Sequence, residues 1–516
     1  MNQNQKFDTI IIGAGSAGAI LATRLTEDPD HHVLLIEAGP DYPTIEAIPA
    51  QARLGYGVPG SIGPHEGHNW GYLAQASMPG VRIALPRGKI TGGSSAVNGQ
   101  IFLRGEADDF NRWAAAGNDL WSFEQVLPYF RKSERDLDFD DEFHGTDGPT
   151  PVQRYPREEW LPDQAAYYDA CIAMGFPECP DHNRPYTTGV GPLPLNCYNG
   201  MRQSTAITYL HHARQRPNLT IRANTLVHRI CFANTTSGSK KATGIVVGDA
   251  RDHSNATVET LEAPDIIVSA GATNSPQLLM LSGIGPADHL RSLDIPVIAD
   301  LPGVGQNLRD HPTVNLRWRV HEDAVLTHDR PVHQVGVRYT AEHSDLVNDM
   351  ILYVGVVPGS RLLYMRPTIN LAESAGEVRL RSTDPTLAPA LNYRFFQTPF
   401  DRQRQREAIR LTMEVAHYHA FEDLIAEELQ PFPLDISSDA ALDAYLLREA
   451  DTGHHSSGTC KMGPSSDPMA VVDQRGAVHG VENLRVVDAS IMPDCVRANI
   501  NAAVLMMGER IADLIR

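Results

Sequence analysis

The sequence predicts an α/β protein with two parts, a Rossmann-type nucleotide-binding domain and a second α+β domain. Residues 7–12 (FDTIII) predict a buried strand, residues 17–25 (AGAILATRL) a helix, and residues 32–39 (HVLLIEAG) a second buried strand. The turn after the first strand reads GAGSAG, the glycine spacing of a dinucleotide-binding turn. Much later, residues 313–395 alternate polar and apolar positions between loops, which predicts strands of a separate antiparallel sheet.

The glycine-rich turn predicts a pyrophosphate site. Gly13 allows the tight turn, Gly15 lets the backbone approach the ligand, and Gly18 lets helix and strand pack closely. The helix that follows presents free N–H groups and the positive end of its dipole to phosphates. Glu37 ends the second strand about 20 residues further on, where a carboxylate accepts a hydrogen bond from a ribose hydroxyl. This acid disfavours a 2′-phosphate but leaves FAD and NAD as alternatives.

The rest of the chain alternates between predicted helices and strands, without repeats or low-complexity linkers. Ser275–Pro276 is expected to begin a helix, because proline suits a first helical turn. The other predicted helices lie within 106–135, at 163–175, 402–418 and 438–449, and at the C-terminal end from 500; the other strands lie at 218–232, 242–247, 265–271 and 483–490.

Composition excludes several classes of function. The chain has 516 residues with 44 basic and 63 acidic side chains, a formal charge of −19, which argues against nucleic acid and anionic membranes as partners. Its six cysteines include no Cys-x-x-Cys pair, so a structural zinc site is not expected, and their sparseness suits a reducing, cytoplasmic compartment. No apolar run approaches the ~20 residues of a transmembrane helix.

The adjacent histidines in DTGHHSSGTCKMG, residues 451–463, are the first candidates for chemistry. They fit a catalytic base, a metal ligand or a solvated loop, and the pairs at 31–32 and 211–212 show that a double histidine is not informative by itself. No nearby carboxylate completes a plausible ligand set, although Cys460 is close in the sequence. Cys460 is better explained as a small buried residue, and no metal site is expected.

Three stretches resemble the glucose–methanol–choline (GMC) flavin oxidoreductases. GKITGGSSAVNGQIFLRG (88–105) and GATNSPQLLMLSGIG (271–285) look like the family's two signature regions, and the chain from HSSGTCKMG to its end resembles the catalytic segment. The likeness runs from residue 7 to 514 and is greatest to choline-dehydrogenase-type alcohol oxidases and dehydrogenases. It implies FAD as the cofactor. Some members attach FAD covalently through a histidine where this chain has Val97, so non-covalent FAD is expected.

The resemblance also implies a domain division and a set of site residues. The FAD-binding domain is expected in three parts, 1–155, 205–312 and 451–516, the last carrying the catalytic segment, and the substrate domain in two, 156–204 and 313–450. His455, three residues before Gly-Thr, matches the catalytic base and Asn499 the second active-site residue, while the side chain of His454 is expected to point elsewhere. The expected cofactor contacts are Gly13, Gly15, Ser16, Ala17, Gly18, Glu37, Ala38, Gly93, Ser94, Asn98, Val227, Asp488, Ala489 and Asn501.

The expected reaction is oxidation of a small-molecule alcohol to an aldehyde or ketone. A histidine with a pKa near neutrality takes the hydroxyl proton, and flavin N5 takes the hydride. Molecular oxygen or a quinone-type acceptor would reoxidise the flavin. The alternative is a non-redox relative of the hydroxynitrile lyase type. Residues 313–450 carry no substrate signature; Tyr353 and Tyr364 fit core and pocket equally, and no cage for a cationic substrate is visible.

Overall fold

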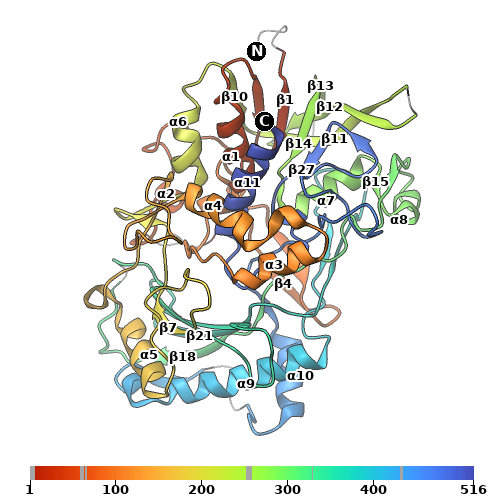
Figure 1. Cartoon of the computed structure of the whole chain (residues 1–516). Coiled ribbons are helices and arrows are strands. Elements are labelled where there is room, and N and C mark those ends of the chain that lie inside the picture. The colour runs from red at the N-terminus through yellow and green to blue at the C-terminus, as the bar shows by residue number, and fades with distance from the viewer. Residues whose placement is uncertain are drawn as a thin grey trace.

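A five-stranded parallel sheet organises the upper half of the molecule (Figure 1). The computed structural model describes residues 6–58, 63, 67–236, 238–251, 258–327, 329–429 and 434–516. The central strands β1 (Thr9–Ile12), β2 (Val33–Ile36) and β14 (Asp265–Val268) are almost wholly buried aliphatic runs, as a sheet covered on both faces requires. The outer strands are β10 (Leu219–Arg222), next to β2, and β27 (Leu484–Val486), next to β14. The strands predicted at 7–12, 32–39, 265–271 and 483–490 are therefore confirmed, and all four belong to this sheet.

Helices from opposite ends of the chain pack together against this sheet. Helix α1 (Ser16–Leu25) lies beside α11 (Asn501–Ile515), where Gly508 faces Ile20 closely enough that a Cβ would lie 3.2 Å from the Ile20 Cβ (Figure 1). Helix α4 (Phe123–Ser133) packs on the outer side of α11. An antiparallel sheet of β11 (Thr225–Asn234), β12 (Lys240–Asp249) and β13 (Glu259–Glu262) lies at the edge of this half.

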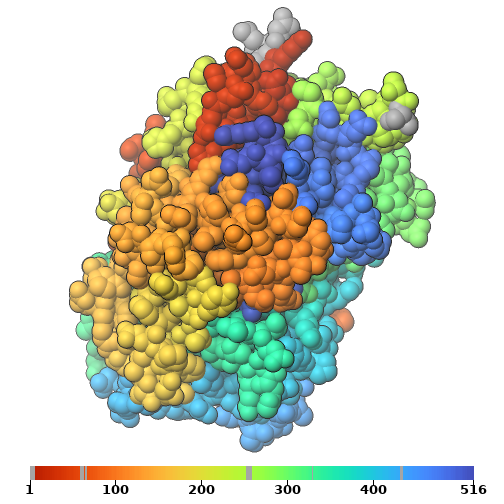
Figure 2. All heavy atoms as spheres, in the orientation of Figure 1, coloured from red at the N-terminus to blue at the C-terminus, as the bar shows by residue number. Residues whose placement is uncertain are grey.

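A second, mainly antiparallel sheet forms the lower half. Its main path runs β24 (Ile425–Glu428), β18 (Leu316–Val320), β21 (Leu362–Ile369), β20 (Met350–Val356), β19 (Val335–Tyr339) and β7 (Gly189–Pro192). Helices α5 (Pro162–Ala173) and α9 (Pro399–Ala416) cover its outer face, and α10 (Asp439–Glu449) packs on α9. The chain thus has the predicted α+β second part. In Figure 2 the orange surface, near residues 100–150, lies across the junction of the two halves.

Two of the predicted boundaries are wrong. Helix α7 (Gly271–Leu281) begins before Ser275, because the Asp488 carboxylate accepts hydrogen bonds from the Gly271 N–H (2.8 Å) and the Ser275 hydroxyl (2.6 Å). Pro276 therefore lies inside the helix, and the Ala272 carbonyl that it leaves unpaired accepts from the Thr459 hydroxyl instead (2.7 Å). Residues 218–232 form two strands, β10 and β11, in different sheets.

Shorter elements complete the described chain. The remaining α-helices are α2 (Ala50–Arg53), α3 (Ala107–Ala115), α6 (His211–Ala213) and α8 (Ala287–Arg291). The remaining strands are β3 (Tyr72–Gln75), β4 (Arg82–Leu85), β5 (Glu134–Asp136), β6 (Thr150–Val152), β8 (Cys197–Tyr198), β9 (Met201–Arg202), β15 (Ile284–Gly285), β16 (Ala299–Asp300), β17 (Pro312–Thr313), β22 (Glu377–Arg379), β23 (Ala390–Asn392), β25 (Asp451–Thr452) and β26 (Val481–Glu482).

Candidate active site

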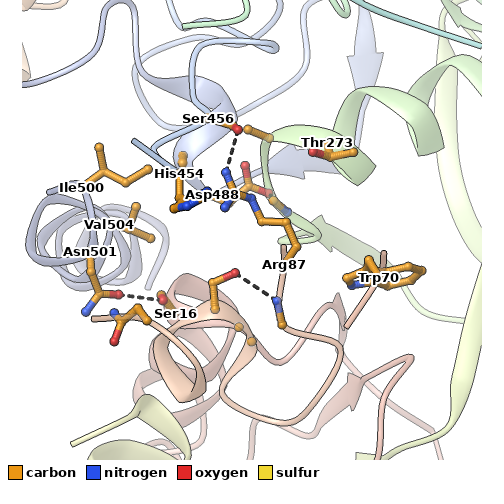
Figure 3. Close-up of a pocket in the computed structure, with 18 of the residues that line it drawn as sticks. Ser16, Trp70, Arg87, Thr273, His454, Ser456, Asp488, Ile500, Asn501 and Val504 are labelled. Atoms are coloured by element: carbon orange, nitrogen blue, oxygen red, sulfur yellow. Dashed lines mark hydrogen bonds between the residues drawn. The ribbon is translucent and has the colours of Figure 1, made fainter. Parts of the chain in front are cut away.

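A cavity of about 580 Å³ lies between the two halves of the molecule. Its walls come from the glycine-rich turn after β1, the end of β2, the loop before residue 100, the first turns of α7 and α11, and the inner face of the second sheet (Figure 3). Of the residues expected at the site, all but Gly18 line this one cavity. Segments more than 400 residues apart in the sequence therefore meet here.

Close backbone approach shapes the nucleotide end of the cavity. Gly13 has φ +103°, in the region that favours glycine, and a Cβ on Gly18 would collide with the Gly13 carbonyl. Gly18 thus allows α1 to pack on β1 and does not itself line the cavity, as expected for the third glycine. Gly93 lies opposite Gly15, where a Cβ on Gly93 would be 2.7 Å from the Gly15 Cα. These two backbones form a narrow cleft, which is open because neither glycine carries a side chain.

Glu37 is a buried carboxylate at the end of β2. Its two oxygens accept hydrogen bonds from the N–H groups of Ala14 (3.0 Å) and Gly39 (2.8 Å). Burial raises its pKa to about 7 against the opposing effect of these hydrogen bonds. The side chain is therefore fixed next to the glycine-rich turn, with lone pairs left to accept from a ligand hydroxyl.

A chain of four polar side chains closes the opposite end of the cavity. The Tyr353 hydroxyl donates to the Asn499 Oδ1 (2.9 Å), and the Asn499 Nδ2 lies 3.1 Å from the His455 Nε2. The His455 Nδ1 lies 2.8 Å from the His311 Nδ1, and the His311 Nε2 lies 2.9 Å from the Val496 carbonyl oxygen. The candidate pair His455 and Asn499 is thus brought into direct contact.

The Val496 carbonyl fixes the direction of every bond in this chain. A carbonyl only accepts, so the His311 Nε2 carries the proton and donates to Val496. The His311 Nδ1 is then an acceptor, which requires a proton on the His455 Nδ1. His455 consequently presents an unprotonated Nε2 to Asn499 and to the cavity. This is the tautomer that a proton acceptor needs.

The backbone around His455 is held for this contact. Asp310, buried beside His311, accepts from the His455 N–H (2.9 Å) and from the Thr452 hydroxyl (2.6 Å). A Cβ on Gly453 would lie 2.9 Å from the His311 Cβ and 3.1 Å from the His455 Nδ1. Glycine at position 453 therefore allows the two imidazoles to come together.

The expectation for His454 was wrong. Its side chain was expected to point elsewhere, yet it lines the same cavity, in a residue with φ +67° (Figure 3). Its Nδ1 is buried and has no hydrogen-bond partner among the described residues. The left-handed backbone at His454 turns two successive side chains toward one space, which an extended loop would not do.

Comparison with known proteins assigns this site to a family. The sequence model of the GMC oxidoreductases matches residues 7–313 with its N-terminal part and 372–508 with its C-terminal part. The chain belongs to the GMC oxidoreductase family. It is 36% identical to the mitochondrial choline dehydrogenase of Mus musculus, over 99% of this chain and 89% of that relative. It is 38% identical to the oxygen-dependent choline dehydrogenase of Klebsiella pneumoniae subsp. pneumoniae, over 99% of this chain and 96% of that relative.

Solved structures agree with this assignment. Pyridoxine 4-oxidase from Mesorbium loti superposes with a TM-score of 0.87 at 30% identity, covering 99% of both chains. A formate oxidase superposes with a TM-score of 0.89 at 26% identity, covering 100% of this chain and 99% of that one. The chain is accordingly an FAD-dependent alcohol oxidoreductase with the GMC fold. No helix among its described residues is both long and apolar enough to cross a membrane.

The cavity suits the family's cofactor. Buried polar atoms without protein partners can bind a ligand, and the Asn501 Nδ2 at the start of α11 and the Thr273 Oγ1 in α7 are two such atoms among the described residues (Figure 3). The Asn501 Oδ1 already accepts from the Ser16 hydroxyl (2.9 Å), so its amide nitrogen is the free group. Together with the Gly15–Gly93 cleft, these groups match an extended dinucleotide.

The remaining expected contacts surround the same space. Asn98 lines the cavity, but its Oδ1 accepts from the Gln100 N–H (3.1 Å) and from Arg202 (3.2 Å), so only its amide N–H groups remain for a ligand. The Asp488 carboxylate is used in holding α7, as described above. Ala17, Ala38, Ser94, Val227 and Ala489 all line the cavity.

The pKa of His455 is lowered well below its usual value, where the sequence predicted a value near neutrality. Burial is the main cause, and His311, His454, Arg87 and Arg366 lower it further. Burial, Arg366 and Arg87 likewise lower the pKa of His454 to about 4. Both side chains are therefore neutral at pH 7.

Several lining residues had no sequence signal of their own. His311 lies in RDHPT and His333 in PVHQV, single histidines without a motif, and Arg366 is one of many arginines. Tyr353, left open between core and pocket, contacts Asn499 in the cavity, whereas the hydroxyl of Tyr364 lies 3.2 Å from the His333 Nε2. The alternation of β20 and β21 would have placed Tyr353 and Arg366 on a common face, but only once the strand register was known.

Proposed function

We propose that His455 is the base that takes the hydroxyl proton when this GMC oxidoreductase oxidises its alcohol. The supporting observation is the direction of the hydrogen-bond chain, which leaves the His455 Nε2 unprotonated at the cavity wall. The lowered pKa keeps that nitrogen free at neutral pH. A general base in contact with the reacting group typically contributes about 10²–10⁴-fold to the rate.

The proposed reaction converts a CH–OH group into a carbonyl. The O–H bond breaks: its proton goes to the His455 Nε2, and its electron pair becomes the second bond between carbon and oxygen. The C–H bond breaks at the same carbon, and its electron pair leaves with the hydrogen as hydride. Bound FAD supplies the acceptor for that hydride. Asn499 would turn its amide N–H toward the substrate oxygen, where it stabilises the negative charge that develops as the proton leaves.

Three further points belong to the same proposal. FAD is bound without a covalent link at the first signature loop, because Val97 offers no nucleophile there. Molecular oxygen or a quinone-type acceptor reoxidises the flavin, and the enzyme works in the cytoplasm. The proposal also includes the domain division that the resemblance implies, with an FAD-binding domain in three parts and a substrate domain in two.

Anaerobic mixing of the purified enzyme with a panel of alcohols tests the reaction. A true substrate should bleach the flavin absorbance and yield one equivalent of aldehyde or ketone. If cyanohydrins are cleaved while no alcohol bleaches the flavin, a lyase of the hydroxynitrile type replaces the proposal.

A further inference from the structure

The second sheet supplies the cavity wall next to the proposed base. Ile351 and Tyr353 of β20 pair with Thr368 and Arg366 of β21, respectively, and all four line the cavity. Directly opposed residues of antiparallel strands project their side chains from the same face. Arg366 is thus the cross-strand neighbour of Tyr353, whose hydroxyl contacts Asn499. This arrangement puts a guanidinium beside the reacting groups.

The charge of Arg366 is incompletely compensated. One Nη donates to the Thr452 carbonyl (2.9 Å), and the buried Nε has no hydrogen-bond partner among the described residues. Its carboxylate partner, Asp451, lies 3.9 Å away. The two oxygens of Asp451 already accept from the Asn315 amide (2.8 Å) and the Thr452 N–H (2.8 Å). A half-buried guanidinium with a buried, unused Nε–H favours an additional acceptor.

The charged side chains that line this half of the cavity are Arg366 and Arg87, while Asp310 and Asp451 lie behind the lining residues. His333 and His454 are neutral at pH 7, because burial and the charge of Arg366 together lower the pKa of each to about 4. Among the described lining residues, the carboxylates are Glu37 and Asp488, which lie at the ends of β2 and β27 on the cofactor side. A positive wall without a facing carboxylate repels an ammonium group and attracts an oxyanion.

We propose that the alcohol substrate carries a carboxylate, which Arg366 binds while the hydroxyl group lies at His455 and Asn499. This inference rests on the proposed function and specifies its substrate class. Two arginines line the cavity, and Arg87 already donates to the Ser456 hydroxyl (2.6 Å). Arg366 has an unused donor, and its planar guanidinium fits one carboxylate in two parallel hydrogen bonds. The same wall disfavours choline, whose quaternary ammonium would face Arg366 without a counter-charge.

Binding is tested without turnover by titrating the FAD-loaded enzyme with benzoate and with benzamide. The visible flavin spectrum reports occupancy beside the cofactor. Benzoate should bind more tightly than benzamide, and Arg366→Gln should weaken benzoate about 10- to 100-fold, the scale of a lost charge-assisted hydrogen bond. Arg366→Lys should retain part of the affinity. Arg319→Gln, which removes a surface arginine paired with Glu427, is the matched control and should change nothing.

Turnover is tested with the hydroxymethylbenzoates against their methyl esters and against choline. The acids should reduce the flavin with a higher kcat/KM than the esters, and Arg366→Gln should remove that preference. Benzoate binding no tighter than benzamide, or choline outperforming the acids, overturns the proposal. If Arg366→Gln fails to retain FAD, two measurements still test the proposal. They are the comparison of acids with esters on the wild type and the benzoate affinity of Arg366→Lys. Arg366-dependent benzoate binding without flavin reduction by any alcohol would instead contradict the proposed function and leave the carboxylate site standing.

Discussion

Replacing His311 tests whether the hydrogen-bond chain sets the reactivity of His455. In His311→Ala the His455 Nδ1–H loses its acceptor 2.8 Å away in a buried site. An unsatisfied buried donor costs about 1–3 kcal/mol, and a tenfold rate change corresponds to about 1.4 kcal/mol. The rate constant for anaerobic flavin reduction should therefore fall about 5- to 150-fold. His311→Gln, which keeps an acceptor oxygen, should recover part of that loss.

The pH dependence separates this positioning role from a structural one. His311 is a cause of the lowered pKa of His455, second to burial. The base acts only when unprotonated, so the wild-type reductive rate should be constant near pH 7 and fall only well below pH 6.5. In His311→Ala the acid limb should move up toward pH 6.5. His333→Gln is the control, because His333 is also buried at the cavity but contacts Val354 and Tyr364 instead. An unchanged rate and an unchanged acid limb in His311→Ala would refute the reasoning.

Four further predictions address the site and the fold. His455→Ala should retain FAD, but its rate constant for flavin reduction, measured by stopped-flow, should fall about 10²–10⁴-fold. His454→Ala should lower the same rate constant less. The reverse order would identify His454 as the base. Asn499→Ala should slow reduction by about 10²-fold, and an unchanged rate excludes it from the site. Because position 97 is valine, acid precipitation should leave yellow supernatant; a yellow pellet contradicts non-covalent FAD. Burial lowers the pKa of His144, but its carboxylate partners raise it to about 10 overall. The folded protein therefore holds this proton more tightly than the unfolded chain, so the unfolding free energy should decline between pH 6.5 and 10 in the wild type. His144→Gln should not show this decline.

The local sequence was enough to predict that Gly13, Gly15 and Glu37 lie together at one end of the cavity. Gly13, Gly15 and Glu37 act through the backbone of adjacent elements, so their spacing carries the geometry. His455 and Asn499 were found through resemblance, since spacing alone left His455 open among a base, a ligand and a surface residue. The structure supplied the reason for the pairing, a contact of 3.1 Å between loops that no local pattern connects.

The errors and omissions share one physical origin. The start of α7 was misjudged because its cap is Asp488, more than 200 residues away, and no local residue signals it. His311, His333 and Arg366 reach the cavity through strand register and a loop crossing between the halves of the molecule. The orientation of His454 depends on a left-handed backbone that a non-glycine residue seldom adopts. Each of these depends on tertiary contacts.

The position of β27 and α11 in the fold has a consequence for biosynthesis. The outer strand of the nucleotide-binding sheet and the helix that packs on α1 follow the other strands of that sheet in the chain, so they leave the ribosome after them. Until they arrive, Ser16 lacks Asn501, α7 lacks Asp488, and one side of the cavity is open. Pairings over nearly the whole length of the chain also slow the search for the native topology. We therefore expect flavin to bind only after β27 and α11 have been synthesised and have joined the sheet.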